Sequence, residues 1–242
     1  MVLASPPSTA YAAEVDRLAQ SLRRGLDATG RPDHSLLAEH VRRAADDKAA
    51  LAAVRVLGPD AFAPALLAGT RPHPLDHQVV AEALRLFPAT AQDPVEALCL
   101  AQAQGLLVAR WSTNGLGGPR PGVEAQAVCA AQAHADWGEW SRRMVWLSPL
   151  AWPTVPGPVT DLALARVGDL ERGLVRAMLR RDQPTAARLA RWVAFGQARG
   201  ADTALELEPV LRHLTQLTGG GARVLLDIEI ARRLVAPEER TG

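Results

Sequence analysis

Aromatic and isoleucine side chains are scarce in this sequence. Aromatic residues make up 4% of the 242 residues, and isoleucine occurs only at Ile228 and Ile230. Strands draw heavily on aromatic and β-branched side chains. A core made mainly of Ala, Leu and Val favours closely packed helices instead, and an apolar content of 48% is ordinary for a globular protein.

Cysteine and net charge are also low. The two cysteines, Cys99 and Cys129, are too few for a disulfide framework and too far apart for a CxxC metal motif, which suits a reduced, cytoplasmic protein. A formal net charge of +1 is too small to attract a nucleic acid or a membrane surface by overall charge. All 27 basic residues except Lys48 are arginine, and with the abundant Ala, Gly and Pro this indicates a GC-rich bacterial genome.

Leader-like and membrane-spanning patterns are not found in the sequence. Residues 1–10 have no basic region followed by a sustained apolar run, so we expect no signal peptide. No apolar run approaches the length of about 18 residues that a membrane-spanning helix needs, so we expect no membrane partner.

Apolar residues recur at three- and four-residue spacing along most of the chain, which predicts helices. Asp33 can cap a helix that runs on to Leu57, and 94–109 is apolar nearly all round, as expected of a central, buried helix. The predicted helices span about 15–26, 33–57, 62–68, 74–86, 94–109, 123–147, 160–181, 184–200, 209–217 and 222–235. The sequence therefore predicts an all-α fold, either a compact multi-helix bundle or an irregular helical-hairpin array of about ten helices, with no significant sheet.

One segment stands out as a loop. Residues 112–122 contain four Gly and two Pro, which cannot sustain a helix. The chain is expected to form a single all-helical domain, 1–242, with the alternative of two subdomains, 1–111 and 123–242, joined by this loop.

Histidines and glycines provide only weak candidates for a site. His73 and His77 have the spacing of a helical metal pair, but Pro74 is expected to place His73 outside the helix. His40 is expected to lie at the edge of an apolar stripe. Gly219–Gly221, with Arg223, could bind an anion at a helix N-terminus or act as a flexible connector. We predict no catalytic residue, metal or cofactor.

Tryptophans are concentrated in residues 137–152. Four of the six lie there, and Arg142 and Arg143 stand among them. Three interpretations remain open: a structural wedge between helical layers, an exposed partner-binding patch, and base stacking or membrane contact. The tryptophans of the cluster are Trp137, Trp140, Trp146 and Trp152.

Arginines form a second concentration in residues 166–191. Arg172, Arg176 and Arg180 repeat every four residues and therefore line one side of a helix, and Arg188 and Arg191 follow. This face is either solvated with local acidic partners or an anion-binding surface. The sequence thus predicts a non-catalytic interaction or regulatory protein with a protein partner. The alternatives are a nucleic-acid-binding protein that contacts phosphates with the Arg face, and a His/carboxylate-dependent enzyme with a site in the helical core.

Overall fold

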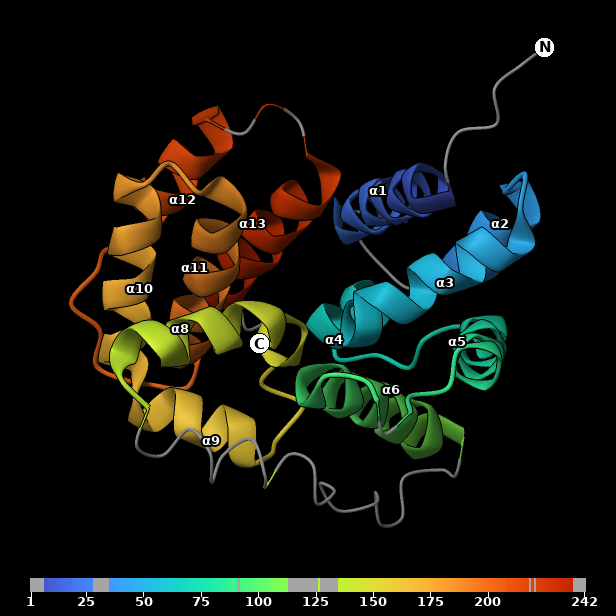
Figure 1. Ribbon diagram of the computed structural model, residues 1–242, viewed down its shortest axis with the longest axis horizontal. Coiled ribbons are helices and arrows are strands. Elements are labelled where there is room, and N and C mark those ends of the chain that lie inside the picture. The colour runs from blue at the N-terminus through green and yellow to red at the C-terminus, as the bar shows by residue number, and fades with distance from the viewer. Residues whose placement is uncertain are drawn as a thin grey trace, which may run out of the picture. The chain divides into compact units, whose positions relative to one another are not determined.

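All regular structure in the described part of the computed structural model is helical. The described residues are 7–27, 35–90, 92–112, 126, 135–217, 219 and 221–236, and no strand occurs among them (Figure 1). The predicted all-α fold is therefore confirmed. The chain divides into two compact units, 1–125 and 126–242. The predicted loop 112–122 lies outside the described residues except for Ser112, and one domain or two subdomains remain predictions.

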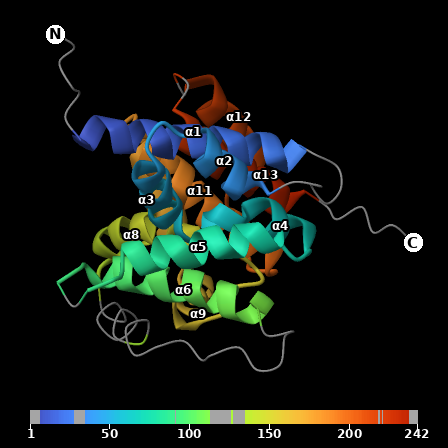
Figure 2. The same ribbon diagram turned by 90° about the vertical axis from the view of Figure 1, so that its right-hand side faces the viewer.

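Unit 1 is built around helix α3. Its elements are α1 (Pro7–Asp27), α2 (Leu36–Arg43), α3 (Asp47–Leu57), the 3-10 helix η1 (Gly58–Phe62), α4 (Ala63–Ala68), α5 (Pro74–Leu86) and α6 (Val95–Ser112). Helix α3 packs against α1 and α5, and α5 lies side by side with α6 (Figure 2). Leu18, Leu22, Val54 and Val80 are fully buried at these contacts, because the apolar stripes of the amphipathic helices face one another.

The predicted single helix over 33–57 is wrong, because the structure divides it into α2 and α3. Asp46 begins α3, and its carboxylate accepts hydrogen bonds from the backbone N–H groups of Lys48 (2.9 Å) and Ala49 (3.1 Å). An aspartate that bonds to the backbone in this way competes with helix continuation and favours a new N-cap. The predicted cap Asp33 lies outside the described residues, and Ser35 caps α2.

Asp76 joins α2 to α5. It lies in the first turn of α5, and its carboxylate accepts hydrogen bonds from the Ser35 hydroxyl and from the Leu37 backbone N–H (2.8 Å). This buried carboxylate therefore sits at the N-terminus of α2 as well as at that of its own helix, where both helix dipoles favour a negative charge.

Gln104 of α6 ties the end of α3 to α6. Its side chain is fully buried, and its Nε2 donates to the carbonyl oxygens of Val54 (3.1 Å) and Gly58 (2.9 Å). These carbonyls belong to the last turn of α3 and to the residue that follows it. The side chain thus satisfies buried polar groups at the end of a helix.

Replacing Gln104 with Met is expected to destabilise unit 1 by about 1–3 kcal/mol, because the similar volume is kept while two buried carbonyls lose a donor. Chemical denaturation measures this loss. A Gln104→Ala variant should cost more, since it adds a cavity. Equal stability of the Met variant and the wild type would show that the two hydrogen bonds contribute nothing.

The stretch Asp47–Ala68 is long and apolar enough to cross a membrane by length and composition. Of its most apolar window, 67% is buried inside the protein. Core helices of soluble proteins meet the same criterion, so this stretch is weak evidence for a membrane span.

Unit 2 is organised around helix α11. Its elements are α8 (Trp137–Trp146), the 3-10 helix η2 (Ser148–Leu150), α9 (Pro158–Ala165), α10 (Val167–Leu179), α11 (Gln183–Ala198), α12 (Leu207–Leu217) and α13 (Ala222–Val235). Helix α11 packs against α10, α12, α13 and α8, and Figure 1 shows it among them. Every residue from 189 to 196 is buried.

Helix α11 has the central position that the sequence predicts for 94–109. That prediction is wrong, because most of α6 is only half-buried. Apolar residues on all sides of α6 are compatible with burial, but α6 packs mainly against α5 and η1, whereas four helices surround α11. A central place depends on the number of packing partners, and composition alone does not determine that number.

The predicted helix over 160–181 is also divided. Helix α9 ends at Ala165, and Arg166 leaves the helical conformation with φ −122° and ψ 30°. The Arg166 guanidinium donates to the carbonyl oxygen of Ala135 (2.9 Å) and to Asp169 (2.7 Å). These contacts hold Arg166 at the corner where the chain changes direction between α9 and α10 (Figure 1). The final helix is predicted correctly over 222–235.

Candidate functional site

The tryptophan cluster does not act as one surface. Trp140 and Trp152 are buried, Trp137 is half-buried, and Trp146 exposes 68% of its surface. Arg166 lies over the Trp140 ring, 5.1 Å from its centroid, and Trp152 is covered in the same way by a buried arginine of α11. Trp140 therefore contributes to the core of unit 2 rather than to an exposed binding patch.

The Arg-rich segment is divided in a similar way. Arg172, Arg176 and Arg180 are exposed on α10, whereas Arg188 is half-buried and Arg191 is fully buried on α11. The predicted common face therefore covers only the α10 arginines. The helix break at Arg180–Asp182 changes the chain direction between the two groups.

Arg191 belongs to a buried ionic cluster with Asp227 of α13. Arg191 Nη1 donates to Asp227 Oδ1 at 3.1 Å, and both side chains are almost inaccessible, with 0% and 1% exposed. Arg188 and Arg223 approach the second carboxylate oxygen at 3.8 and 3.4 Å. Arg223, which follows Gly219–Gly221 and was a candidate anion ligand, is thus directed at Asp227. Sequence reasoning missed this cluster, although a lone Asp in the apolar run of α13 was a usable signal.

The exposed arginines of α10 alternate with exposed apolar side chains. Leu179 exposes 81% and Val175 exposes 41% of its surface. Both lie on the same side of the helix as the arginines, because residues three and four apart share a face. The apolar groups were not part of the predicted site.

Helix α8 extends this surface. Arg176 stacks on Trp137 at 5.4 Å, and a side-chain carbon added at Gly138 would lie 3.3 Å from its Nη1. Arg142 Nε donates to the carbonyl oxygen of Gly138 (3.2 Å), so both guanidinium groups lie near Gly138. Trp146 lies one turn farther along α8. We call this surface the α8–α10 face, and it consists of Arg142, Trp146, Arg172, Val175, Arg176, Leu179 and Arg180.

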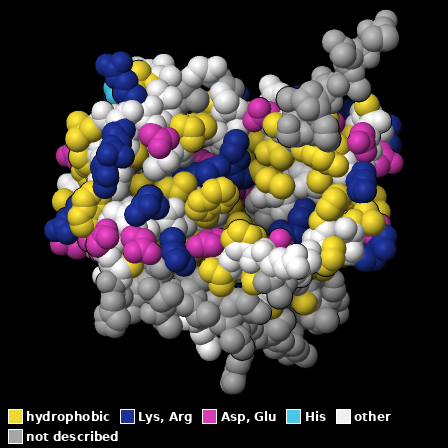
Figure 3. Space-filling model, viewed as in Figure 1, with side chains coloured by type: hydrophobic (Ala, Val, Ile, Leu, Met, Phe, Trp, Pro, Cys, Tyr) yellow, Lys and Arg dark blue, Asp and Glu magenta, His cyan; other side chains and the backbone are white. Residues whose placement is uncertain are grey.

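Acidic side chains neutralise only some of the arginines of this face. Asp169 pairs with Arg172 at 3.3 Å but is shared with Arg166. Asp136 caps α8, where hydrogen bonds from the backbone N–H groups of Glu139 and Gly138 lower the pKa of its carboxyl. Arg180 forms no ion pair with any residue in the described ranges. Figure 3 shows basic, acidic and hydrophobic side chains close together over the part of the surface formed by α8 and α10.

Arg143 contributes less to this face than predicted. Its side chain is 33% exposed and lies 4.0 Å from a carboxylate oxygen of Glu139 on the same helix.

The described histidines of unit 1 make structural contacts. His73 lies outside the helix, as predicted, and caps α5 by accepting the Leu75 N–H at Nδ1 (3.2 Å). His77 stacks on Trp111 with ring centroids 5.6 Å apart. His40 is buried beside Glu14, with 3.6 Å between Nε2 and Oε2. Within the described ranges, no group of three or more His, Cys, Asp or Glu side chains could hold a metal ion; His34, His134 and Cys129 lie outside them.

Stability of unit 1 is expected to fall as the pH decreases below about 6.5. Burial lowers the pKa of His40 and of His77, although Glu14 and Asp76 oppose these shifts. The unfolded chain therefore binds protons near pH 6.5 while the folded chain does not, so stability is full above this pH and is lost as the pH falls toward the folded values.

Thermal melts between pH 7.5 and 5 test this expectation. A His40→Gln, His77→Gln variant should show a weaker dependence of its melting temperature on pH, whatever its absolute stability. Identical slopes for the variant and the wild type would assign the pH dependence to other groups.

Comparisons with known proteins do not identify the chain: no protein-family model, no curated protein and no solved structure matches it. The interpretation of the site therefore depends on its own geometry and chemistry.

Proposed function

We propose that the chain is a non-catalytic interaction protein that binds a protein partner through the α8–α10 face. The observation that carries this proposal is Leu179, a leucine that exposes 81% of its surface between two exposed arginines, Arg176 and Arg180. A single exposed apolar residue is ordinary. Here the exposed Val175 lies one helical turn before Leu179, and apolar groups rimmed by charge are typical of interfaces.

The residue types of this face also favour a protein partner. Trp and Arg contribute most to the binding energy at protein interfaces. Trp146 is already exposed, so a partner can cover it without a change in the fold of unit 2. Arg176 is held over Trp137, which reduces the conformational entropy that binding would cost.

Site-specific photo-crosslinking in the cells of the natural host tests the proposal. A photoreactive amino acid at position 179 is expected to give discrete crosslinked protein bands. Val56 of unit 1 is a matched control, because it is also apolar and is 62% exposed. Substituting Arg176→Glu and Arg180→Glu should remove the bands at 179. Bands of equal intensity from positions 179 and 56 would contradict the proposal.

The nucleic-acid alternative is favoured by the row of Arg172, Arg176 and Arg180. Phosphate contacts would make the affinity fall steeply with salt. Asp136 and Asp169 beside the row, and the protruding Leu179, are less suited to a phosphate backbone. Gel shifts with single- and double-stranded DNA and RNA at low salt distinguish the two functions, and we expect no shift.

A further inference from the structure

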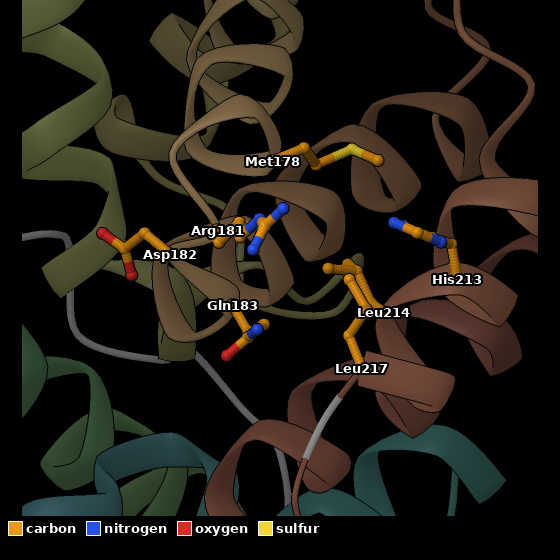
Figure 4. Close-up of a pocket in the computed structure, with 8 residues that line it drawn as sticks. Met178, Arg181, Asp182, Gln183, His213, Leu214 and Leu217 are labelled. Atoms are coloured by element: carbon orange, nitrogen blue, oxygen red, sulfur yellow. The ribbon is translucent and has the colours of Figure 1, made fainter.

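A shallow hollow lies next to the α8–α10 face, where the turn between α10 and α11 approaches α12. It is open to solvent and has room for little more than a water molecule. Its apolar part is formed by Met178, Leu214 and Leu217, and its polar rim by Arg181, Gln183 and His213. Figure 4 shows the Met178 side chain and the His213 ring extending over this space from opposite elements. Met178 directly precedes the exposed Leu179, so the hollow and the face adjoin.

The conformation of Arg181 is unfavourable for an arginine. Its φ is 58°, and it is the one described residue other than glycine with a positive φ. The turn ends α10 in a Schellman arrangement, in which Arg181 N–H donates to Met178 O and Asp182 N–H donates to Ala177 O, each at 3.0 Å. Glycine is favoured at this position because it has no side chain to clash. The arginine side chain is therefore not required by the fold, and it stands at the rim of the hollow.

Charges around the hollow are mainly basic. Arg180 and Arg181 form no ion pair with residues in the described part of the chain. Arg212, which precedes His213 on α12, lies 3.8 Å from Glu208, but both side chains are more than half exposed, so this contact is weak. Asp182 accepts the Thr185 N–H as N-cap of α11, and its carboxylate points away from the hollow (Figure 4).

We infer that the partner segment is an acidic amphipathic helix whose apolar side chains cover Leu179 and the apolar rim of the hollow. This inference rests on the proposed function. Val175 and Leu179 are one helical turn apart, and Met178, which precedes Leu179 along α10, forms part of the rim of the hollow. A helix with apolar residues at positions i, i+4 and i+7 presents a strip of this kind. Carboxylates beside its strip would meet Arg176, Arg180 and Arg181, which supplies the charge complementarity.

A displayed peptide library tests the partner class with the full chain as bait. Each peptide is a helix of about five turns. At the positions of the apolar strip (i, i+4 and i+7) the library contains Ala, Leu, Met or Phe. At the positions that flank the strip it contains Glu, Gln or Lys. We expect selection of Glu over Lys at the flanks together with large apolar residues over Ala in the strip.

The best selected peptide is then titrated against purified variants by fluorescence anisotropy. Arg180→Gln, Arg181→Gln should weaken binding by about tenfold or more. The matched control Arg42→Gln, Arg43→Gln, which removes two exposed arginines of unit 1, should leave it unchanged. Arg181→Gly should weaken binding while keeping or raising the melting temperature, which separates a binding role from a structural one.

Three results would overturn the inference: no enrichment, enrichment of Lys, or selected peptides that bind the Arg180, Arg181 variant as well as the wild type. Selection of Glu without any preference for large apolar residues would also overturn it, because the hollow would then play no part. Crosslinks from position 179 combined with a failed selection would refute only the helical acidic partner. Absence of both would refute the proposed function as well.

Discussion

Replacing Asp227 with Ala is expected to destabilise unit 2 by about 3–5 kcal/mol, a cost typical of removing one partner of a buried ion pair. Asp227 is 1% exposed and Arg191 is 0% exposed, so the Arg191 charge would lose this carboxylate in a place that water cannot reach. Arg188 and Arg223 are 30% and 15% exposed, and they can turn toward solvent. Chemical denaturation followed by circular dichroism measures the loss.

A second substitution separates charge from packing at this pair. Asp227→Leu combined with Arg191→Met removes both charges and keeps most of the volume. Well-packed apolar replacements of buried ion pairs are often neutral or stabilising. The double variant should therefore be more stable than Asp227→Ala. If it is equally unstable, the cost comes from lost packing or from the other arginines rather than from the unpaired charge.

Trp140→Ala is expected to cost about 3–5 kcal/mol, as for other fully buried tryptophans. The side chain is 0% exposed, and Arg166 covers its ring. Truncation would leave a cavity and would remove the surface on which this guanidinium lies. Thermal and chemical denaturation measure the effect.

Two variants give the controls for Trp140. Trp146→Ala, on the same helix but 68% exposed, should change stability by no more than about 0.5 kcal/mol. Trp140→Phe should be much milder than Trp140→Ala, because Nε1 of Trp140 is buried without a hydrogen-bond partner among the described residues. Similar losses for Trp140→Ala and Trp146→Ala would mean that the burial of Trp140 does not control stability.

The helical segments were predictable because their signals are local. Helix α13 was predicted with its observed bounds, since Gly221 precedes it and Pro237 follows it. The breaks within 33–57 and 160–181 were missed. Helix α2 ends at Arg43 and Asp46 caps α3, but in the sequence Asp46 is only one of several polar residues there. Arg166 is held at its corner by Ala135, a residue 31 positions away.

The sequence predicted which residue types form the candidate site, but it did not predict which individual residues are exposed there. Regular spacing predicted the row of Arg172, Arg176 and Arg180, and these three are exposed. Arg191 and Trp140 belong to the same Arg-rich and Trp-rich segments but are buried. Their burial follows from the packing of α11 and α8 against other helices, which no local pattern contains.

The amino-acid pattern alone predicts that this protein is helical, where most of its helices lie, and that its unusual residues gather after position 136. Periodicity and capping act over a few residues, so one sequence contains enough information for them. Which arginines and tryptophans face water depends on how the helices pack against one another. This packing also brings Asp227 to Arg191 and places Met178 beside His213, because burial and ionic contacts depend on residues that are distant along the chain.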